Sequence, residues 1–233
     1  MTDHKITIAI DGFSSTGKST VAKQLAKELS YVYVDTGAMY RAITLYAMRK
    51  KYITLDSFDE ESLTNDLPSL HLKFVFESSR GFAAIYLNDE NIEDEIRTME
   101  VSQYVSRVAA LSEVRKKLVS QQQQMGLEKG VVMDGRDIGT VVFPDAELKI
   151  FMTATAEERA KRRFKEMKEK GQKVSYDEVL KNVEERDHLD TTREDSPLVK
   201  AEDALEIDNS SLSLEEQFNK LLTIAKNSIA KHN

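Results

Sequence analysis

The chain contains no cysteine among its 233 residues. This absence excludes disulfide bonds, thiolate metal sites and a cysteine nucleophile, and it fits a reducing compartment. The four histidines are scattered and form no ligand cluster in the sequence. No apolar run approaches the roughly 20 residues that span a membrane, and the first apolar stretch is too short for a signal peptide. We therefore expect a cytoplasmic protein with no membrane partner.

Positive charges are fewer than negative ones. Lysine and arginine number 33 against 40 aspartate and glutamate residues, which gives a net charge of -7. This balance argues against a general nucleic-acid-binding surface, so we expect no nucleic-acid partner and assign any phosphate recognition to local arginines. The length suits one α/β domain with an insert, and a small anionic ligand suits the charge.

A phosphate-binding loop stands near the start of the chain. Residues 12–19 match the pattern G-x-x-x-x-G-K-[ST], with an apolar strand predicted over 6–10 and a helix over 20–29. A plain glycine turn before a helix is the alternative, and the strand–loop–helix order disfavours it. Lys18 would reach the β- and γ-phosphates of ATP or GTP, and Ser19 would bind Mg²⁺. The expected triphosphate contacts are Gly12, Phe13, Ser14, Ser15, Thr16, Gly17, Lys18, Ser19 and Thr20.

Short apolar strands alternate with helical segments along the rest of the chain. Strands are predicted over residues 31–34, 130–134, 148–152 and 205–208. Helices are predicted after residue 35, from residue 100 onward, and over residues 156–170 and 212–229. This order predicts an α/β fold with a parallel sheet and helices on both faces. Residues 70–76 and 82–87 break the alternation and predict a hairpin, with a second turn at 88–90, as a small antiparallel insert on the main sheet.

Two of the predicted strands end in carboxylates, at Asp35 and Asp134. Ligand groups gather at the carboxyl ends of parallel strands. Asp134 is placed like the aspartate that helps to hold Mg²⁺ in phosphate-loop enzymes, although an Asp turn is an open alternative. Glycine, arginine and carboxylates continue through residues 135–140 and indicate a site there.

Arginines recur beside apparent strand ends and helix termini, at positions 41, 115, 136, 186 and 193. Each alone could form a surface ion pair. Together they exceed what one triphosphate needs, which favours phosphoryl transfer to a second phosphate-bearing substrate. Arg159, Arg162 and Arg163 share one face of the predicted helix, which is either a solvated face or a phosphate clamp.

These motifs resemble the bacterial cytidylate kinases from the first strand to the final helix. The resemblance rests on residues 12–19, 35–41, 106–110, 115, 134–144 and 185–193, and the block 134–144 is its most specific part. It implies a P-loop NTPase three-layer fold with a monophosphate-binding insert over 59–100 and a helical lid over 156–172. It also implies a monomer that uses ATP and Mg²⁺ to convert CMP or dCMP into CDP or dCDP, in pyrimidine nucleotide metabolism.

The resemblance assigns a role to each candidate residue. Lys18, Arg136, Arg186 and Arg193 would be catalytic, Ser19 and Asp134 would hold the metal, and Arg159, Arg162 and Arg163 would clamp ATP. CMP would be bound by Asp35, Thr36, Arg41, Ser106, Arg115, Arg136, Asp137, Arg186, Asp190 and Arg193, with Ser106, Arg115 and Asp137 reading the cytosine edge. Thr36 stands where many relatives have serine, which retains the hydroxyl group. Leu189 and Thr191 stand where close relatives can carry arginines, so the lid-side clamp is expected to be weaker.

Other functions stay open at this point. A kinase for UMP, AMP or a small metabolite such as shikimate would share the phosphate loop. A GTP-dependent switch is a further alternative, although the sequence contains no Asn-Lys-x-Asp guanine-reading motif. The expected mechanism is direct in-line transfer without a covalent intermediate, because an acceptor phosphate is already ionised and needs no strong general base.

Overall fold

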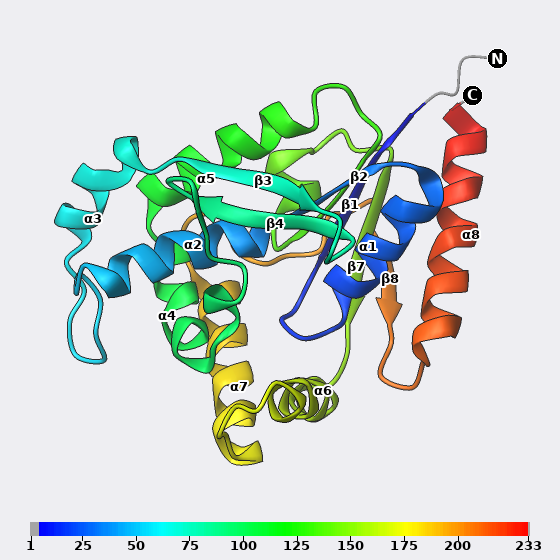
Figure 1. Ribbon diagram of the computed structural model, residues 1–233. Coiled ribbons are helices and arrows are strands. Elements are labelled where there is room, and N and C mark those ends of the chain that lie inside the picture. Colours follow the sequence, from blue (N-terminus) through cyan, green and yellow to red (C-terminus); the bar gives the residue numbers. More distant parts are fainter. Residues whose placement is uncertain (1–4, 233) are drawn as a thin grey trace. The chain divides into compact units, whose positions relative to one another are not determined.

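The computed structural model describes residues 5–232, so the start of the chain, on which the signal-peptide expectation partly depends, lies outside it. The chain divides into two compact units (Figure 1). The first, here called the phosphate-loop unit, comprises the chain up to Asp35 together with the chain from Gln122 onward. The second, the insert unit, comprises Thr36–Gln121. No helix in residues 5–232 combines the length and apolar character needed to cross a membrane.

A five-stranded parallel sheet forms the centre of the phosphate-loop unit. Its strand order is β2-β6-β1-β7-β8. The strands are β1 (Thr7–Gly12), β2 (Val32–Asp35), β6 (Val131–Gly135), β7 (Leu148–Thr153) and β8 (Leu205–Asp208). All five strands predicted from the sequence are confirmed, with their ends shifted by two residues at most. The α/β fold class with a parallel sheet is confirmed as well.

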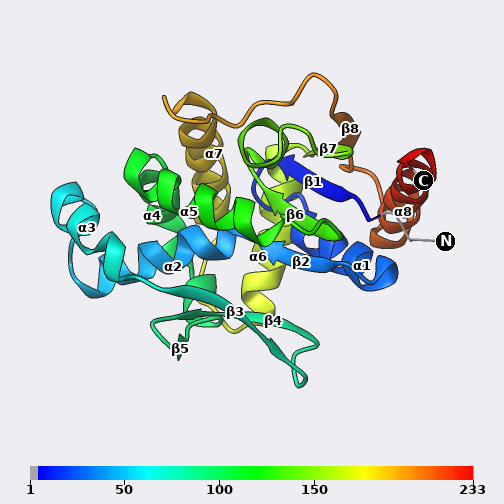
Figure 2. The same cartoon turned by 90° about the horizontal axis from the view of Figure 1, so that it is seen from above.

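The helices of this unit are α1 (Lys18–Leu29), α6 (Ala156–Glu169), α7 (Tyr176–Thr192) and α8 (Leu214–His232). Helix α8 lies beside α1 in both views (Figures 1 and 2), and both helices pack into one apolar core with the sheet. Val21 and Leu25 of α1 and Leu221 of α8 are buried there because apolar residues recur at helical spacing. The core fixes the start of α1 against the sheet.

Helix α7 has a strong start signal. The Ser175 hydroxyl accepts the Glu178 N–H, and the Glu178 carboxylate accepts the Ser175 N–H, which completes a capping box. Such reciprocal bonds satisfy two of the amides that a helix leaves unpaired at its start. The box therefore sets the register of a helix that carries Arg186 and Asp190.

The insert unit contains the predicted hairpin. Strands β3 (Leu72–Glu77) and β4 (Phe82–Leu87) pair antiparallel, and β5 (Glu90–Asn91) pairs with β4. Asn88 and Asp89 have φ values of 46° and 70°, as the second predicted turn requires. The predicted antiparallel insert is confirmed, and its strands form a three-stranded sheet of their own. Figure 2 shows them as a separate ribbon.

The helical elements of the insert unit are α2 (Thr36–Arg49), α3 (Glu60–Asp66), η1 (Leu67–Ser69), η2 (Glu95–Arg97), α4 (Met99–Ala109) and most of α5 (Ser112–Met125). Helix α2 packs against both α4 and β4. The helical region predicted to resume at Glu100 is two helices, because the chain leaves helical geometry between Ala109 and Ser112.

Candidate active site

The carboxyl ends of three neighbouring strands meet at one edge of the parallel sheet. In the register of the sheet, Asp35 of β2 lies opposite Asp134 of β6, and Asp11 of β1 lies opposite Gly135. The phosphate loop leaves β1 at the same edge and enters α1. The prediction that these strand-end groups gather is confirmed for this unit.

The phosphate loop begins at Gly12, which lies beside Met152 of β7. A Cβ atom on Gly12, which has a φ of 142°, would lie 2.0 Å from the Met152 carbonyl oxygen. Gly17 has a φ of 87° and precedes the first turn of α1. Glycine is required at both positions because L side chains rarely adopt these angles. The loop amides are thereby free to turn toward an anion at the helix start.

The hydroxyl groups of the loop differ in whether they have a partner, and one of them suits a bound triphosphate. Within residues 5–232, the buried Ser14 hydroxyl has no hydrogen-bond partner, although it lies in the loop that would surround the phosphates. Buried polar groups are normally paired, so this one calls for a ligand acceptor. The Thr16 hydroxyl instead closes the loop on itself by donating to the Phe13 carbonyl at 3.0 Å.

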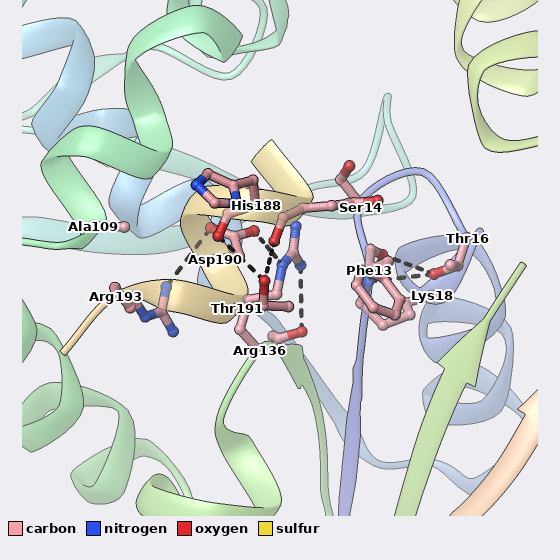
Figure 3. A network of polar contacts seen from close by, with 12 residues as sticks. Phe13, Ser14, Thr16, Lys18, Ala109, Arg136, His188, Asp190, Thr191 and Arg193 are labelled. Carbon is pink, nitrogen blue, oxygen red and sulfur yellow. Dashed lines mark hydrogen bonds and ion pairs between the residues drawn. The ribbon is translucent and has the colours of Figure 1, made fainter. Parts of the chain in front are cut away.

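Lys18 is buried at the first turn of α1, with 4% of its surface exposed. Its Nζ donates to the Phe13 carbonyl at 2.5 Å and to the Thr16 hydroxyl at 3.3 Å, as Figure 3 shows. Burial, reinforced by the charge of Arg136, lowers the pKa of Lys18 to about 7. Phosphate oxygens would give this ammonium group anionic partners in place of neutral ones.

Ser19 and Asp134 lie together, as expected for the predicted metal ligands. The Ser19 hydroxyl donates to Asp134 Oδ2 at 2.9 Å, and the Tyr33 hydroxyl donates to Oδ1 at 2.7 Å. Burial and the neighbouring charge of Asp35 raise the pKa of Asp134, which a divalent cation would reverse. The oxygen donors fit Mg²⁺. Among residues 5–232 no cluster of three or more acidic, histidine or cysteine side chains could hold a metal, so water and phosphate oxygens would complete the shell.

Asp190 of α7 is the centre of an arginine cluster. Arg136 Nε donates to Asp190 Oδ2 at 2.9 Å, and Arg193 lies 3.7 Å from Oδ1 (Figure 3). Burial opposes ionisation of Asp190, but Arg136, Arg186 and Arg193 outweigh it and hold its pKa below the usual value. The structure therefore brings these four predicted residues together. Three guanidinium groups around one carboxylate leave positive charge for an anionic ligand.

The arginines predicted to form the ATP clamp lie on α6. Arg159 forms an ion pair with Asp187, with nitrogen–oxygen distances of 2.5 and 2.9 Å, and its guanidinium lies 5.0 Å from the centre of the Phe13 ring. Arg162 donates to the Asn209 carbonyl at 2.7 Å, and Arg163 is half-buried. Arg159 is only 4% exposed, so the solvated-face alternative is wrong for this position.

Asn209 is a site residue that the sequence did not reveal. Its side chain is fully buried. Its amide nitrogen donates to the Thr16 carbonyl at 2.6 Å and to Gln217 Oε1 at 2.5 Å, and its oxygen accepts from Arg162 at 3.1 Å. It thus joins the phosphate loop to α6 and α8.

The insert unit holds Thr36, Arg41, Ser106 and Arg115, whereas Asp137 belongs to the phosphate-loop unit. The buried guanidinium of Arg115 donates to the Ala109 carbonyl at 3.1 Å and lies 5.4 Å from the centre of the Tyr40 ring. This contact brings α5 against α2, the helix that begins at Thr36 and carries Arg41. Thr36 and Ser106 are also buried, although threonine and serine side chains are mostly exposed in proteins.

Asp11 is a second residue that sequence reasoning missed. One carboxylate oxygen accepts the Ile138 N–H at 2.8 Å and the other accepts the Gly139 N–H at 2.7 Å. Burial is the largest influence on this group and raises its pKa to about 6, with Asp137 adding to the rise and Lys18 opposing it. Its position directly before Gly12 was the only signal in the sequence.

The raised pKa of Asp11 predicts a pH dependence of stability. Since the folded pKa exceeds the unfolded one by about 2 units, the folded state loses up to about 3 kcal/mol as pH rises from 4 to 6.5. Asparagine does not titrate, so the unfolding free energy of Asp11→Asn should lack this loss. Urea unfolding of both proteins across the pH range measures it, and parallel pH profiles would contradict the assignment.

The first strand of the parallel sheet leads through a glycine loop into a helix that carries Lys18, and an arginine cluster lies in the same unit. These features define a P-loop phosphotransferase. The family model described as cytidylate kinase matches residues 8–227, and the chain belongs to this family. The cytidylate kinase of Flavobacterium psychrophilum is 67% identical over 96% of this chain and 99% of its own. That of Flavobacterium johnsoniae is also 67% identical, over 94% of this chain and 96% of its own. That of Phocaeicola vulgatus is 58% identical over 91% of this chain and 93% of its own.

Proposed function

We propose that this protein transfers the γ-phosphoryl group of ATP to CMP or dCMP, giving CDP or dCDP and ADP. The observation that carries the proposal is the arginine cluster around Asp190, in the same unit as the phosphate loop. One triphosphate needs the loop, a metal and one or two arginines, so further guanidinium groups suit a second phosphate. Membership of the cytidylate kinase family supports CMP as the acceptor.

On the donor side, the loop amides and Lys18 hold the β- and γ-phosphates. Ser19 and Asp134 hold Mg²⁺, which when bound neutralises charge on the phosphate oxygens. Arg159, Arg162 and Arg163 clamp the triphosphate from α6. The present ion pair of Arg159 with Asp187 keeps this guanidinium beside the loop residue Phe13. Donor binding therefore rests mainly on charges that are already in position, which lowers the reorganisation that the reaction requires.

On the acceptor side, Arg41, Arg136 and Arg193 hold the CMP phosphate. Arg186 contacts the phosphates and Asp190 the sugar, and Asp35 and Thr36 complete the acceptor contacts. Transfer is in line from ATP to a phosphate oxygen of CMP, and the arginines neutralise charge that spreads over the transferring group. No residue need act as a strong general base, because the attacking oxygen is already ionised.

Ser106, Arg115 and Asp137 read the cytosine edge. A carboxylate accepts from the exocyclic amine of cytosine, while arginine and hydroxyl donors meet the ring acceptors. Uracil lacks this amine and would leave Asp137 without its partner, which is the kind of mismatch that gives strong discrimination. We propose further that the protein acts as a cytoplasmic monomer on small molecules, without nucleic acid or membrane.

The test is ADP formation from MgATP with CMP, dCMP, UMP, AMP and GMP as separate acceptors and a control without acceptor. Turnover restricted to CMP and dCMP supports the proposal. Turnover centred on UMP or AMP would reassign the base pocket. Hydrolysis that needs no acceptor would favour a nucleotide-dependent switch, and no ADP with any acceptor would favour a kinase for another metabolite.

Substitutions in the proposed base pocket should separate the two substrates. Arg115→Met and Asp137→Ala are expected to raise KM for CMP by roughly 10- to 100-fold, because each removes a hydrogen bond to a charged group, and to leave KM for ATP within about twofold. Arg107→Met is a matched control, since Arg107 donates to the Thr54 and Leu55 carbonyls and lies over the Phe58 ring, and none of these is a proposed site residue. Equal losses for CMP and ATP would show that the base pocket is misassigned.

A further inference from the structure

Asp11 lies at the junction of two functional segments of the phosphate-loop unit. It is the last residue of β1 before Gly12, where the phosphate loop begins, and only 5% of its surface is exposed. Both carboxylate oxygens accept backbone N–H groups from residues 127 and 128 positions further along the chain. These amides belong to Ile138 and Gly139, directly after Asp137.

The segment that Asp11 holds is a single turn of π-helix, η3 (Ile138–Val142). The Asp137 carbonyl accepts the N–H groups of Val141 and Val142 at 2.9 and 3.2 Å, so the backbone of Asp137 is fixed by its own turn. The hydrogen bonds that the Ile138 and Gly139 N–H groups donate to Asp11 in turn hold this segment against β1. The position of Asp137 relative to the phosphate loop therefore depends on one carboxylate.

The turn is closely packed on the side that faces Asp11 and Lys149. A Cβ atom on Gly139 would lie 3.4 Å from Asp11 Oδ2 and 3.1 Å from Cδ of Lys149. Lys149 is itself held, because its Nζ donates to the Pro144 carbonyl at 2.5 Å and to Asp203 at 2.9 Å. Close packing on this side means that losing the Asp11 bonds would let the turn move away from β1, toward a less defined position.

We propose that Asp11 is a positioning residue for acceptor specificity, which holds Asp137 at a fixed place relative to the phosphate loop. The proposal rests on the base-reading role that the proposed function gives to Asp137. Only a carboxylate supplies two acceptors side by side to two adjacent amides. An asparagine keeps one acceptor and turns an N–H₂ group toward the other amide, where the two donors repel. The turn should then be less well placed although the fold has changed little.

The test compares Asp11→Asn with a matched control at the opposite end of the same strand. Glu147 accepts the Thr7 N–H at 2.8 Å, so Glu147→Gln also weakens a carboxylate–amide contact to β1, but away from the turn. For each protein, kcat/KM is measured with CMP and with UMP at saturating MgATP, together with KM for ATP and the melting temperature. The ratio of kcat/KM for CMP to that for UMP reports specificity, which a loss of stability alone would not change.

We expect Asp11→Asn to lower the CMP/UMP ratio by about tenfold, the equivalent of one weakened hydrogen bond to a charged group, and Glu147→Gln to keep the wild-type ratio. If Asp11→Asn does not fold, Gly139→Ala serves instead, because its added methyl group would lie 3.1 Å from Lys149 Cδ and 3.4 Å from Asp11 Oδ2, and so crowds the contact between the turn and Asp11 while leaving the carboxylate intact. An unchanged ratio in the folded variant would overturn this proposal alone. A wild-type protein that does not prefer CMP to UMP would overturn the proposed role of Asp137 and this proposal with it.

Discussion

Replacing Lys18 with methionine is expected to lower kcat by roughly 10²- to 10³-fold, the cost of removing one preorganised charge from a phosphoryl-transfer site. The fold should persist, because the Lys18 side chain is buried and an apolar chain of similar length avoids the cost of burying an ammonium group. Steady-state ADP formation with CMP as acceptor and thermal unfolding by circular dichroism measure the two effects.

Lys27→Met is the matched control for this substitution. Lys27 lies on the same helix, α1, but is exposed, so its loss should change neither kcat nor stability appreciably. Wild-type turnover by Lys18→Met would contradict the assignment of the phosphate loop. A melting temperature far below that of the control would instead assign Lys18 a structural role.

Arg136→Met is expected to lower kcat/KM for CMP by roughly 10²-fold or more and to reduce stability as well. The first effect follows from losing a guanidinium group at the proposed acceptor phosphate. The second follows because Asp190 is buried and loses the partner that donates to it at 2.9 Å. Removing one member of a buried ion pair costs about 3–5 kcal/mol, and the remaining charges of Arg186 and Arg193 should keep the loss near the lower end. Urea unfolding and initial rates measure both.

A second substitution separates these two consequences. Arg136→Lys keeps a cation beside Asp190 but loses the planar guanidinium fork, so it should recover most of the lost stability while activity stays low. Recovery of activity together with stability would show that Arg136 acts only by holding Asp190. Loss of stability without loss of activity in Arg136→Met would remove the residue from the proposed acceptor site.

The parts of the site that the sequence predicts are those that depend on neighbouring residues. The phosphate loop, its strand and its helix follow from local apolar periodicity and glycine placement, and residues 205–208 form a strand at the predicted bounds. The gathering of Asp35 and Asp134 follows from the geometry of parallel strands. Each strand, helix or loop is thus recognised from a pattern of fewer than about twenty residues, and the general geometry of parallel sheets then places the strand ends together.

The parts that the sequence does not predict depend on contacts between distant segments. The bonds from Ile138 to Asp11 and from Tyr33 to Asp134 join residues 127 and 101 positions apart, and no local pattern encodes such pairing. Tyr33 could have been suspected, because strand alternation puts it on the same face as Asp35. The hairpin of the insert was predicted, but a hairpin pattern fixes only its own pairing, so the sequence could not show which sheet its strands form.

Asn209 bears on how the protein ages chemically. Asparagine is a heat-sensitive residue, and one that precedes serine in a loose loop is prone to lose its side-chain amide when the next backbone nitrogen attacks it. Here Asn209 is fully buried, and its amide is held by Thr16, Gln217 and Arg162. This restraint disfavours the attack. Were the amide hydrolysed, a carboxylate would face the Thr16 carbonyl of the phosphate loop, so the loop keeps its shape only while the contacts of Asn209 with α6 and α8 stay intact.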